Sequence, residues 1–230
     1  MKAQLSIVFE NLRGKAGNVV IQGGRSGLVV RPRVVGRNPS TPAQQAARSA
    51  MQKAAAAYTA LTPTQLSAWQ AYAETQSRPN PVTGIPYHPT ANTTFIALAT
   101  KFLQVSPTSA VPVAPPAAPF GGDSVAVTVG AEAGQVTFTG NKNNAAGVTT
   151  ELLLQALASP VRTPRYAAYR TKGFQVFALG SLSRSFTVPP GYYAAAYRFV
   201  EIATGQASPL IPLGIVQHVT TSVEDERKAA

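Results

Sequence analysis

Thr41-Pro42-Ala43-Gln44 and Thr62-Pro63-Thr64-Gln65 are two copies of one helix-start pattern, 21 residues apart. In each copy the threonine hydroxyl can accept a hydrogen bond from the backbone N–H of the glutamine, and the glutamine side chain can accept one from the threonine N–H. Proline suits the first helical position because the N–H that it lacks would have no partner there. The two copies therefore predict two capped helices, one beginning at Pro42 and the other at Pro63.

Apolar residues recur at helical spacing after both starts. Between residues 42 and 61 they are mostly alanines, whereas the second run carries the larger Leu66, Trp69 and Tyr72. A third helix is expected after Thr90 or Asn92, and the minimal turn between the first two helices predicts an αα-corner. Residues 41–105 are thus predicted to form a three-helix domain with Trp69 in its core, and the residues expected to cap its helices are Thr41, Pro42, Gln44, Thr62, Pro63 and Gln65.

The net charge of +11 is concentrated in the N-terminal half. Residues 1–120 contain eleven Lys or Arg against two Glu, whereas residues 121–230 contain nine against seven acidic residues. Short β-like pieces before the first helix, at 5–9, 18–22 and 28–30, can pair as a small sheet or extend the edge of a neighbour's sheet. Residues 1–40 are therefore predicted to form an extended basic β-arm, whose partner-binding residues would be Arg13, Lys15, Arg25, Arg31, Arg33 and Arg37.

A basic arm has two kinds of partner, nucleic-acid phosphates or an acidic protein surface. The first two predicted helices carry only Arg48 and Lys53 as basic residues and show no recognition-helix pattern. The aromatic residues are not interleaved with the arginines, as a stacking platform for single strands requires. These features favour a protein partner, with nucleic acid or a plain solvated arm as the alternatives.

The second half of the chain has the pattern of an all-β domain. Five prolines between residues 106 and 123 predict a polyproline-like linker, after which the hydrophobic period changes from 3.6 to 2. About seven strand-like runs follow, the fourth of them expected at residues 174–179. Residues 124–220 are therefore predicted to form an immunoglobulin- or fibronectin III-like β-sandwich, followed by a polar tail at 221–230, so that the fold class is α+β.

One short segment of this domain resembles the corner before the sixth strand of fibronectin III-like domains. It is Val188-Pro189-Pro190-Gly191-Tyr192-Tyr193. In such a corner a tyrosine hydroxyl is bonded to the backbone a few residues upstream. Tyr192 or Tyr193 is expected to make this bond.

Patterns of catalysis and metal binding are missing from the sequence. It has no cysteine, and His88 and His218 have no acidic neighbour at a ligand spacing. There is no paired-carboxylate arrangement, nucleophile elbow or phosphate-binding loop. Nor is there an 18-residue apolar run or a signal-peptide pattern at the N-terminus. We therefore expect no enzymatic activity, no cofactor, no metal and no membrane partner.

Several segments of the N-terminal half resemble a family of tailed-phage and prophage proteins. The family pattern has a Gly/Lys/Val start, an Arg-Pro-Arg segment, the motif Asn-Pro-x-Thr-Pro-x-Gln-Gln and a helix with Ala-Leu-Thr-x-x-Gln-x-x-Ala-Trp. Most of residues 13–73 match this pattern, and the resemblance implies a virion component without an enzymatic role. The matching segments are Arg13-Gly14-Lys15-Ala16-Gly17-Asn18-Val19-Val20, Arg31-Pro32-Arg33, Arg37-Asn38-Pro39-Ser40-Thr41-Pro42-Ala43-Gln44-Gln45, Ala60-Leu61-Thr62-Pro63-Thr64-Gln65 and Ala68-Trp69.

A basic arm, a helical corner, a linker and a sandwich are parts typical of a protein that docks on an assembly. The sequence therefore predicts a minor capsid, cement or decoration protein, made in the host cytoplasm and located in the virion. Its partners would be the major capsid protein or other virion proteins, and it would associate with copies of itself. A neck or tail component is the alternative among structural proteins. A DNA-binding protein that uses the basic arm, and a host-surface adhesin, are the alternatives from other classes.

Overall fold

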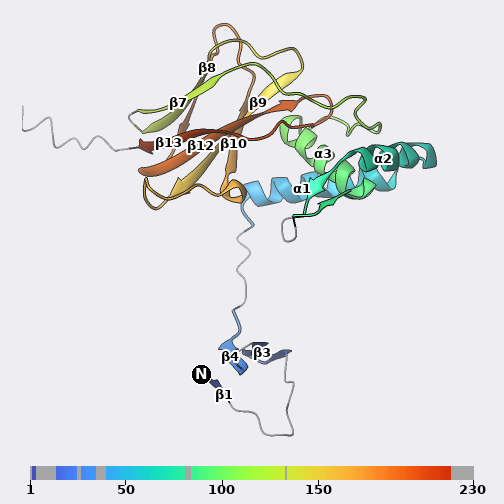
Figure 1. The fold of residues 1–230 in the computed structure, drawn as a ribbon, viewed down its shortest axis with the longest axis vertical. Helices are drawn as coiled ribbons and strands as arrows, with labels where there is room; N and C mark the ends of the chain where they lie inside the picture. The colour runs from blue at the N-terminus through green and yellow to red at the C-terminus, as the bar shows by residue number, and fades with distance from the viewer. Residues whose placement is uncertain are drawn as a thin grey trace, which may run out of the picture. The chain divides into compact units, whose positions relative to one another are not determined.

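The computed structural model describes residues 2–3, 14–24, 27–34, 40–80, 84–132 and 134–218. The chain forms two compact units, residues 1–45 and residues 46–230, and we call the second unit the body. Over the described residues the first unit contains a small antiparallel sheet, and the body combines helices with further antiparallel sheets (Figure 1). This combination places the protein in the α+β class, as predicted.

The first unit contains a four-stranded antiparallel sheet, which we call the N-terminal sheet, with the strand order β1-β4-β3-β2. The pieces at 18–22 and 28–30 pair with one another, whereas the piece at 5–9 lies outside the described residues. A two-residue turn joins β2 to β3, and its Gly17 has the positive φ, 55°, that such a tight hairpin requires. The strands are β1 (Lys2–Ala3), β2 (Gly14–Ala16), β3 (Val19–Gly24) and β4 (Gly27–Pro32).

A capping box begins each of the first two helices. At the start of α1 (Pro42–Thr59), the Thr41 N–H donates to Gln44 Oε1 at 3.2 Å and the Gln44 N–H donates to Thr41 Oγ1 at 3.4 Å. Thr62 and Gln65 make the same two bonds, at 2.8 and 3.4 Å, at the start of α2 (Pro63–Thr75). Reciprocal bonds of this kind satisfy backbone donors that a helix start otherwise leaves without partners.

The third helix, α3 (Ala91–Val105), begins after Thr90, whose hydroxyl accepts the N–H of Thr93 at 3.3 Å. A short two-stranded sheet, β5 (Arg78–Pro79) and β6 (Pro86–Tyr87), lies between α2 and α3 in the chain. The three helices lie together beside one end of the other two sheets of the body (Figure 1).

Trp69 is the centre of the helical core. Its side chain is 3% exposed and packs edge-to-face on Phe95, with 5.0 Å between the ring centroids. The indole N–H donates to the carbonyl of Val113 at 2.9 Å. Val113 belongs to the proline-rich segment 106–123, which the sequence predicts to be a linker between two domains. In the structure this segment is packed against the helices inside one compact unit.

The remaining strands form two antiparallel sheets with the orders β11-β8-β7 and β10-β9-β12-β13. The three-stranded sheet consists of β7 (Val127–Glu132), β8 (Gln135–Gly140) and β11 (Ser183–Thr187). The four-stranded sheet consists of β9 (Val148–Leu157), β10 (Arg170–Gln175), β12 (Gly191–Glu201) and β13 (Ile211–His218). A single 3-10 turn, Tyr166–Ala168, precedes β10.

The position predicted for the fourth strand of this region was wrong. The sequence predicts a strand at 174–179, a mostly apolar run, whereas β10 is Arg170–Gln175. β10 is a polar edge strand with a bulge between Thr171 and Gly173, so it lacks the apolar residues that the prediction depends on. Phe177, which lies in the predicted run, is fully buried after the strand ends.

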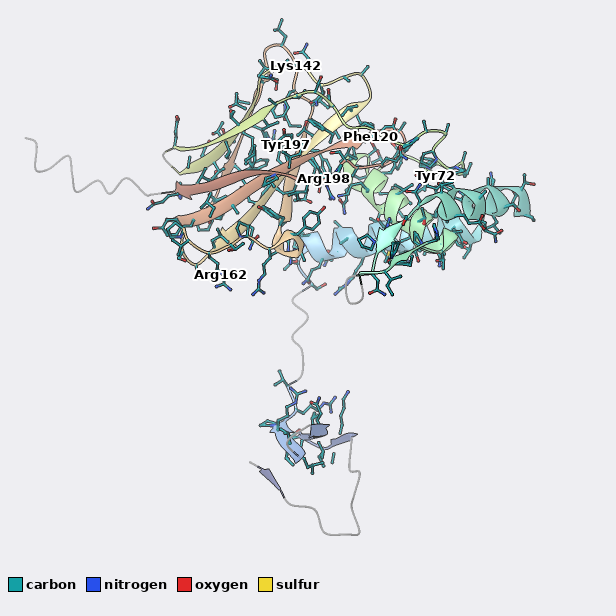
Figure 2. The ribbon with its side chains drawn as sticks, viewed as in Figure 1. Tyr72, Phe120, Lys142, Arg162, Tyr197 and Arg198 are labelled. Carbon is teal, nitrogen blue, oxygen red and sulfur yellow. The ribbon has the colours of Figure 1, made fainter. Side chains whose placement is uncertain are left out.

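The inward side chains of the two sheets form one hydrophobic cluster, which includes Phe138 from β8 and Leu152 from β9. Tyr197, on β12, also belongs to this cluster (Figure 2). The Tyr193 hydroxyl donates to the Pro189 carbonyl at 2.7 Å, so Tyr193 is the tyrosine that ties the corner before β12 to the backbone. Tyr192 is only half-buried.

Candidate functional site

The N-terminal sheet gathers its described basic residues on one face. Val20 is the direct cross-strand partner of both Lys15 on β2 and Arg31 on β4, so the three side chains share a face. The Arg33 N–H donates to Asn18 O at 2.7 Å, which continues the β3–β4 pairing and places Arg33 on the face of Arg31. All three basic side chains are exposed, and strand spacing puts Lys15 and Arg31 about 10 Å apart.

The other three predicted partner-binding residues, Arg13, Arg25 and Arg37, lie outside the described residues. No acidic residue occurs between residues 14 and 34 of the sequence, so the described strands supply nothing to neutralise the basic face. We therefore take this face, defined by Lys15, Arg31 and Arg33, as the first candidate site.

The opposite face of the same sheet is apolar. Alternation along the strands places Val19, Ile21, Leu28 and Val30 there, and each of these side chains is only half-buried. Among the described residues of the first unit, none is buried. A small sheet normally needs its apolar face covered to be stable, so this face is suited to a partner surface.

A buried ion-pair centre joins the helices to the four-stranded sheet. Glu151 on β9 is fully buried and accepts hydrogen bonds from Lys101 Nζ, at 3.0 and 3.1 Å, and from Arg198 Nε at 2.6 Å. The Thr171 hydroxyl also donates to this carboxylate. Burial acts to raise the pKa of Glu151, but the Arg198 hydrogen bond, the Lys101 charge and the Thr171 hydroxyl outweigh it and hold the pKa below its ordinary value. The carboxylate is therefore ionised at neutral pH.

Sequence reasoning missed this centre. Glu151 and Arg198 are direct cross-strand partners on β9 and β12, whereas Lys101 comes from α3, 50 residues earlier than Glu151. Burial is the first cause that lowers the pKa of Lys101, and the nearby Arg198 charge adds to it. The sequence does carry one signal for this centre. Glu151 and Arg198 are each a charged residue within a mostly apolar strand, and a charge that is buried in a strand requires a partner of opposite charge.

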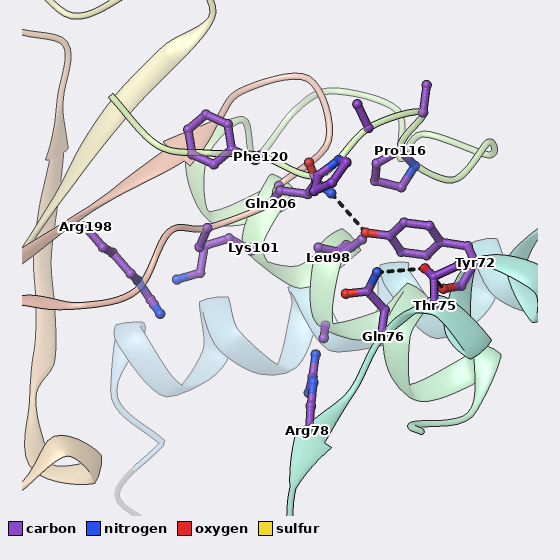
Figure 3. Close-up of a pocket in the computed structure, with 16 residues that line it drawn as sticks. Tyr72, Thr75, Gln76, Arg78, Leu98, Lys101, Pro116, Phe120, Arg198 and Gln206 are labelled. Atoms are coloured by element: carbon purple, nitrogen blue, oxygen red, sulfur yellow. Dashed lines mark hydrogen bonds between the residues drawn. The ribbon is translucent and has the colours of Figure 1, made fainter. Parts of the chain in front are cut away.

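A groove lies between the helices, the proline-rich segment and the loop that follows β12 (Figure 3). Its volume is about 810 Å³, and Arg78, Lys101 and Arg198 are among the residues that line it. Gln206, in the same lining, is 8% exposed, and its Nε2 donates to the Tyr72 hydroxyl at 2.9 Å. The Gln206 Oε1 atom is buried and has no hydrogen-bond partner among the described residues.

Within the described part of the chain, no group of three or more His, Asp or Glu residues is placed to hold a metal ion. None of the helices described there is long and apolar enough to cross a membrane. His88 Nδ1 is hydrogen-bonded to Gln76 O at 2.7 Å, and His218 is buried at the end of β13.

No protein-family model matches the chain, and no curated protein matches it in sequence.

Proposed function

We propose that this chain is a non-enzymatic structural protein of a tailed-phage virion, acting as a minor capsid, cement or decoration protein. It docks on the head lattice through the N-terminal sheet and the helices that follow, and copies of it associate symmetrically on the particle. The observation that carries the proposal is the two-faced N-terminal sheet, with exposed cations on one side and half-buried apolar side chains on the other. The resemblance of residues 13–73 to phage and prophage proteins supports the same assignment.

Each face of the sheet suits a protein partner. Completing the burial of Val19, Ile21, Leu28 and Val30 would contribute roughly 3–6 kcal/mol, from about half of the full burial energy of four such side chains. The basic face, with Lys15, Arg31 and Arg33, complements an acidic capsid surface. β1 and β2 form the two edges of the sheet and can accept a strand from a neighbour.

We also infer that the two larger sheets of the body form an immunoglobulin- or fibronectin III-like sandwich. Seven strands divided three and four, one shared core and the bond from Tyr193 to Pro189 support this inference. In the constant-type immunoglobulin arrangement the fourth strand joins the sheet of the first two strands, whereas β10 joins the sheet of β9. The sandwich would project from the particle or bridge neighbouring subunits.

The first experiment compares full-length protein with a variant that lacks residues 1–40, each added to particles that lack the protein. We expect the deletion to abolish particle binding, because it removes both faces of the sheet. Quantitative mass spectrometry of sedimented particles gives the copy number relative to the major capsid protein. Undiminished occupancy of the deletion variant would contradict the proposal.

A matched variant separates the two faces of the sheet. Replacing Lys15, Arg31 and Arg33 with Gln removes the charge and leaves the apolar face intact, so binding should weaken and lose most of its salt dependence.

The copy number of the wild-type protein on the particle separates the two structural assignments. Near-lattice copy number would indicate cement or decoration, whereas a few copies to about a dozen would indicate a neck or tail component.

DNA binding is the second candidate, because three cations share one exposed face. No aromatic residue occurs between residues 14 and 34, so the described strands offer no base-stacking platform. A gel-shift titration of the full chain in rising salt tests this candidate. Absence of a shift at low salt would remove it.

A further inference from the structure

We propose that the groove between the helices and the loop after β12 binds an extended peptide segment of a partner protein that carries an acidic side chain. This site lies entirely within the body and does not depend on the N-terminal sheet. The inference rests on the charge of the groove and on two groups that line it, the terminal nitrogens of Arg198 and the side-chain carbonyl of Gln206, which have no hydrogen-bond partner among the described residues (Figure 3).

The groove has an excess of two positive charges. Arg78, Lys101 and Arg198 line it, and Glu151 is the one carboxylate bonded to any of them among the described residues. The three donors of the Lys101 ammonium are used on Gln104 Oε1, at 2.7 Å, and on both oxygens of Glu151. Lys101 therefore contributes its positive field, while direct bonds to a ligand are left to the arginines.

Arg198 is arranged as a receptor for a carboxylate. Glu151 holds its Nε at 2.6 Å, and among the described residues its two terminal nitrogens make no hydrogen bond. The side chain is 23% exposed, which leaves this edge accessible from the groove. A guanidinium fixed from behind by a buried carboxylate loses little freedom on binding, and its fork matches the two oxygens of a carboxylate.

Gln206 distinguishes a peptide from a simple anion. Its buried Oε1 receives no hydrogen bond from the described residues, and a buried acceptor without a donor is destabilising until it receives one. An ionised phosphate diester offers only acceptors, whereas a peptide offers backbone N–H groups beside its acidic side chain. A ligand that satisfies both Arg198 and Gln206 must therefore carry an anion and an N–H donor.

The size and the remaining lining also suit a short peptide. A volume of about 810 Å³ is within the roughly 300–1,000 Å³ range of sites that hold drug-sized ligands. Leu98, Pro116 and Phe120 supply apolar wall that can contact the side chains next to the acid. The arrangement combines a few polar groups with an apolar surround, as in most ligand sites.

The test is a titration of the ¹⁵N-labelled full chain, followed by NMR, with the capped peptide Ac-Ala-Ala-Glu-Ala-Ala-NH₂. We expect shifts at the Gln206 side-chain amide and at the Ala207 N–H, and affinity about tenfold higher than for the same peptide with Gln in place of Glu. Dimethyl phosphate, an ionised diester without an O–H donor, should leave the Gln206 amide unshifted at equal concentration. Equal affinity for the Glu and Gln peptides, or equal binding of dimethyl phosphate at Gln206, would overturn the proposal.

Three variants locate the binding to the groove. Arg198→Lys keeps a cation for Glu151 but removes the forked guanidinium, and Arg78→Ala removes an exposed cation from the groove wall. Each variant should lower the affinity for the Glu peptide severalfold or more. Arg162→Ala makes the same charge change as Arg78→Ala but lies away from Tyr72 and the groove (Figure 2), and should leave affinity unchanged within about twofold. Equal weakening by Arg78→Ala and Arg162→Ala would show general attraction to a basic protein and would contradict a site in the groove.

Discussion

The N-terminal sheet and the body use the same kinds of residue in opposite ways. In the body, β9 is buried along almost its whole length, and Trp69 and Phe95 are covered where the helices meet. In the N-terminal sheet, the four apolar residues of one face are only half-buried, and no described residue of that unit is buried. Because burial of apolar surface is the main driving force for folding, the body is suited to be stable by itself and the sheet to be completed by a partner.

The basic residues show the same contrast. Lys101 and Arg198 in the body are fixed by the buried carboxylate of Glu151, at 3.0 and 2.6 Å. Lys15 and Arg31 in the N-terminal sheet are exposed, in a stretch of sequence without acids. A charge that is paired and buried acts on the stability of its own fold, whereas exposed charges act mainly on association.

Removing the charge of Glu151 should have the largest effect on this contrast. Glu151→Gln keeps the size of the side chain but leaves Lys101 and Arg198 without their counter-charge, so the free energy of unfolding should fall by about 3–5 kcal/mol. Urea unfolding followed by circular dichroism measures the change. The matched change in the N-terminal sheet, Arg31→Gln, should alter the unfolding of the body by less than about 0.5 kcal/mol. Similar losses in both variants would break the comparison.

The pH dependence of the unfolding free energy, compared between wild type and Glu151→Gln, gives a second check on Glu151. Its pKa in the folded protein is below the ordinary 4.5, so its stabilisation is complete above that value and is lost as the pH falls through the lower, folded pKa. The difference in unfolding free energy between wild type and Glu151→Gln should therefore shrink as the pH falls below about 4.5. A constant difference down to strongly acidic pH would assign the loss to packing instead of charge.

Gly205→Ala tests how much the contact between α3 and the loop that follows β12 contributes to the stability of the body. Gly205 has a φ of +75°, and a Cβ there would lie 2.4 Å from Leu98 O and 2.8 Å from Phe102 N, both on the backbone of α3. Gly205→Ala must therefore move the loop away from the helix, and we expect a loss of about 2–4 kcal/mol in the free energy of unfolding. Chemical unfolding followed by tryptophan fluorescence, which reports on Trp69, measures it.

Gly214→Ala is the control for backbone strain alone. Gly214 has a φ of +104°, but a Cβ there would have no atom of the described residues within 4 Å. The control should cost about 1–2 kcal/mol. Equal losses in the two alanine variants would mean that the contact between the loop and α3 contributes little.

The sequence predicted the features that depend on neighbouring residues. The bonds of Thr41 with Gln44 and of Thr62 with Gln65 span three residues, and β9 (Val148–Leu157) has a run of three leucines, 152–154, at its centre. Such signals are complete within a short window, so helix starts and central strands can be placed from them.

The features that were missed depend on contacts between distant segments. The bond from Trp69 to Val113 spans 44 residues and holds the proline-rich segment against the helices. Lys101 and Glu151 are 50 residues apart, and Arg198 follows Glu151 by 47 residues, so no short window of sequence contains the ion-pair centre. β10 pairs with β9 through a polar, bulged edge, which has no period in the sequence. The groove follows from these contacts, so a local pattern could not predict it.

The smallest expected effect concerns the corner before β12. Tyr193→Phe removes the bond from the hydroxyl to the Pro189 carbonyl, 2.7 Å, from a side chain that is 7% exposed, and should lower the free energy of unfolding by about 1 kcal/mol. Tyr192→Phe is the matched control, because Tyr192 is half-buried and its hydroxyl makes no hydrogen bond among the described residues, and its effect should stay within about 0.5 kcal/mol. Both changes lie outside residues 1–45, so particle binding should be the same for both variants and for wild type. If Tyr193→Phe reduced particle binding without reducing stability, the corner before β12 would belong to the docking surface, and docking would not be confined to the N-terminal sheet and the helices.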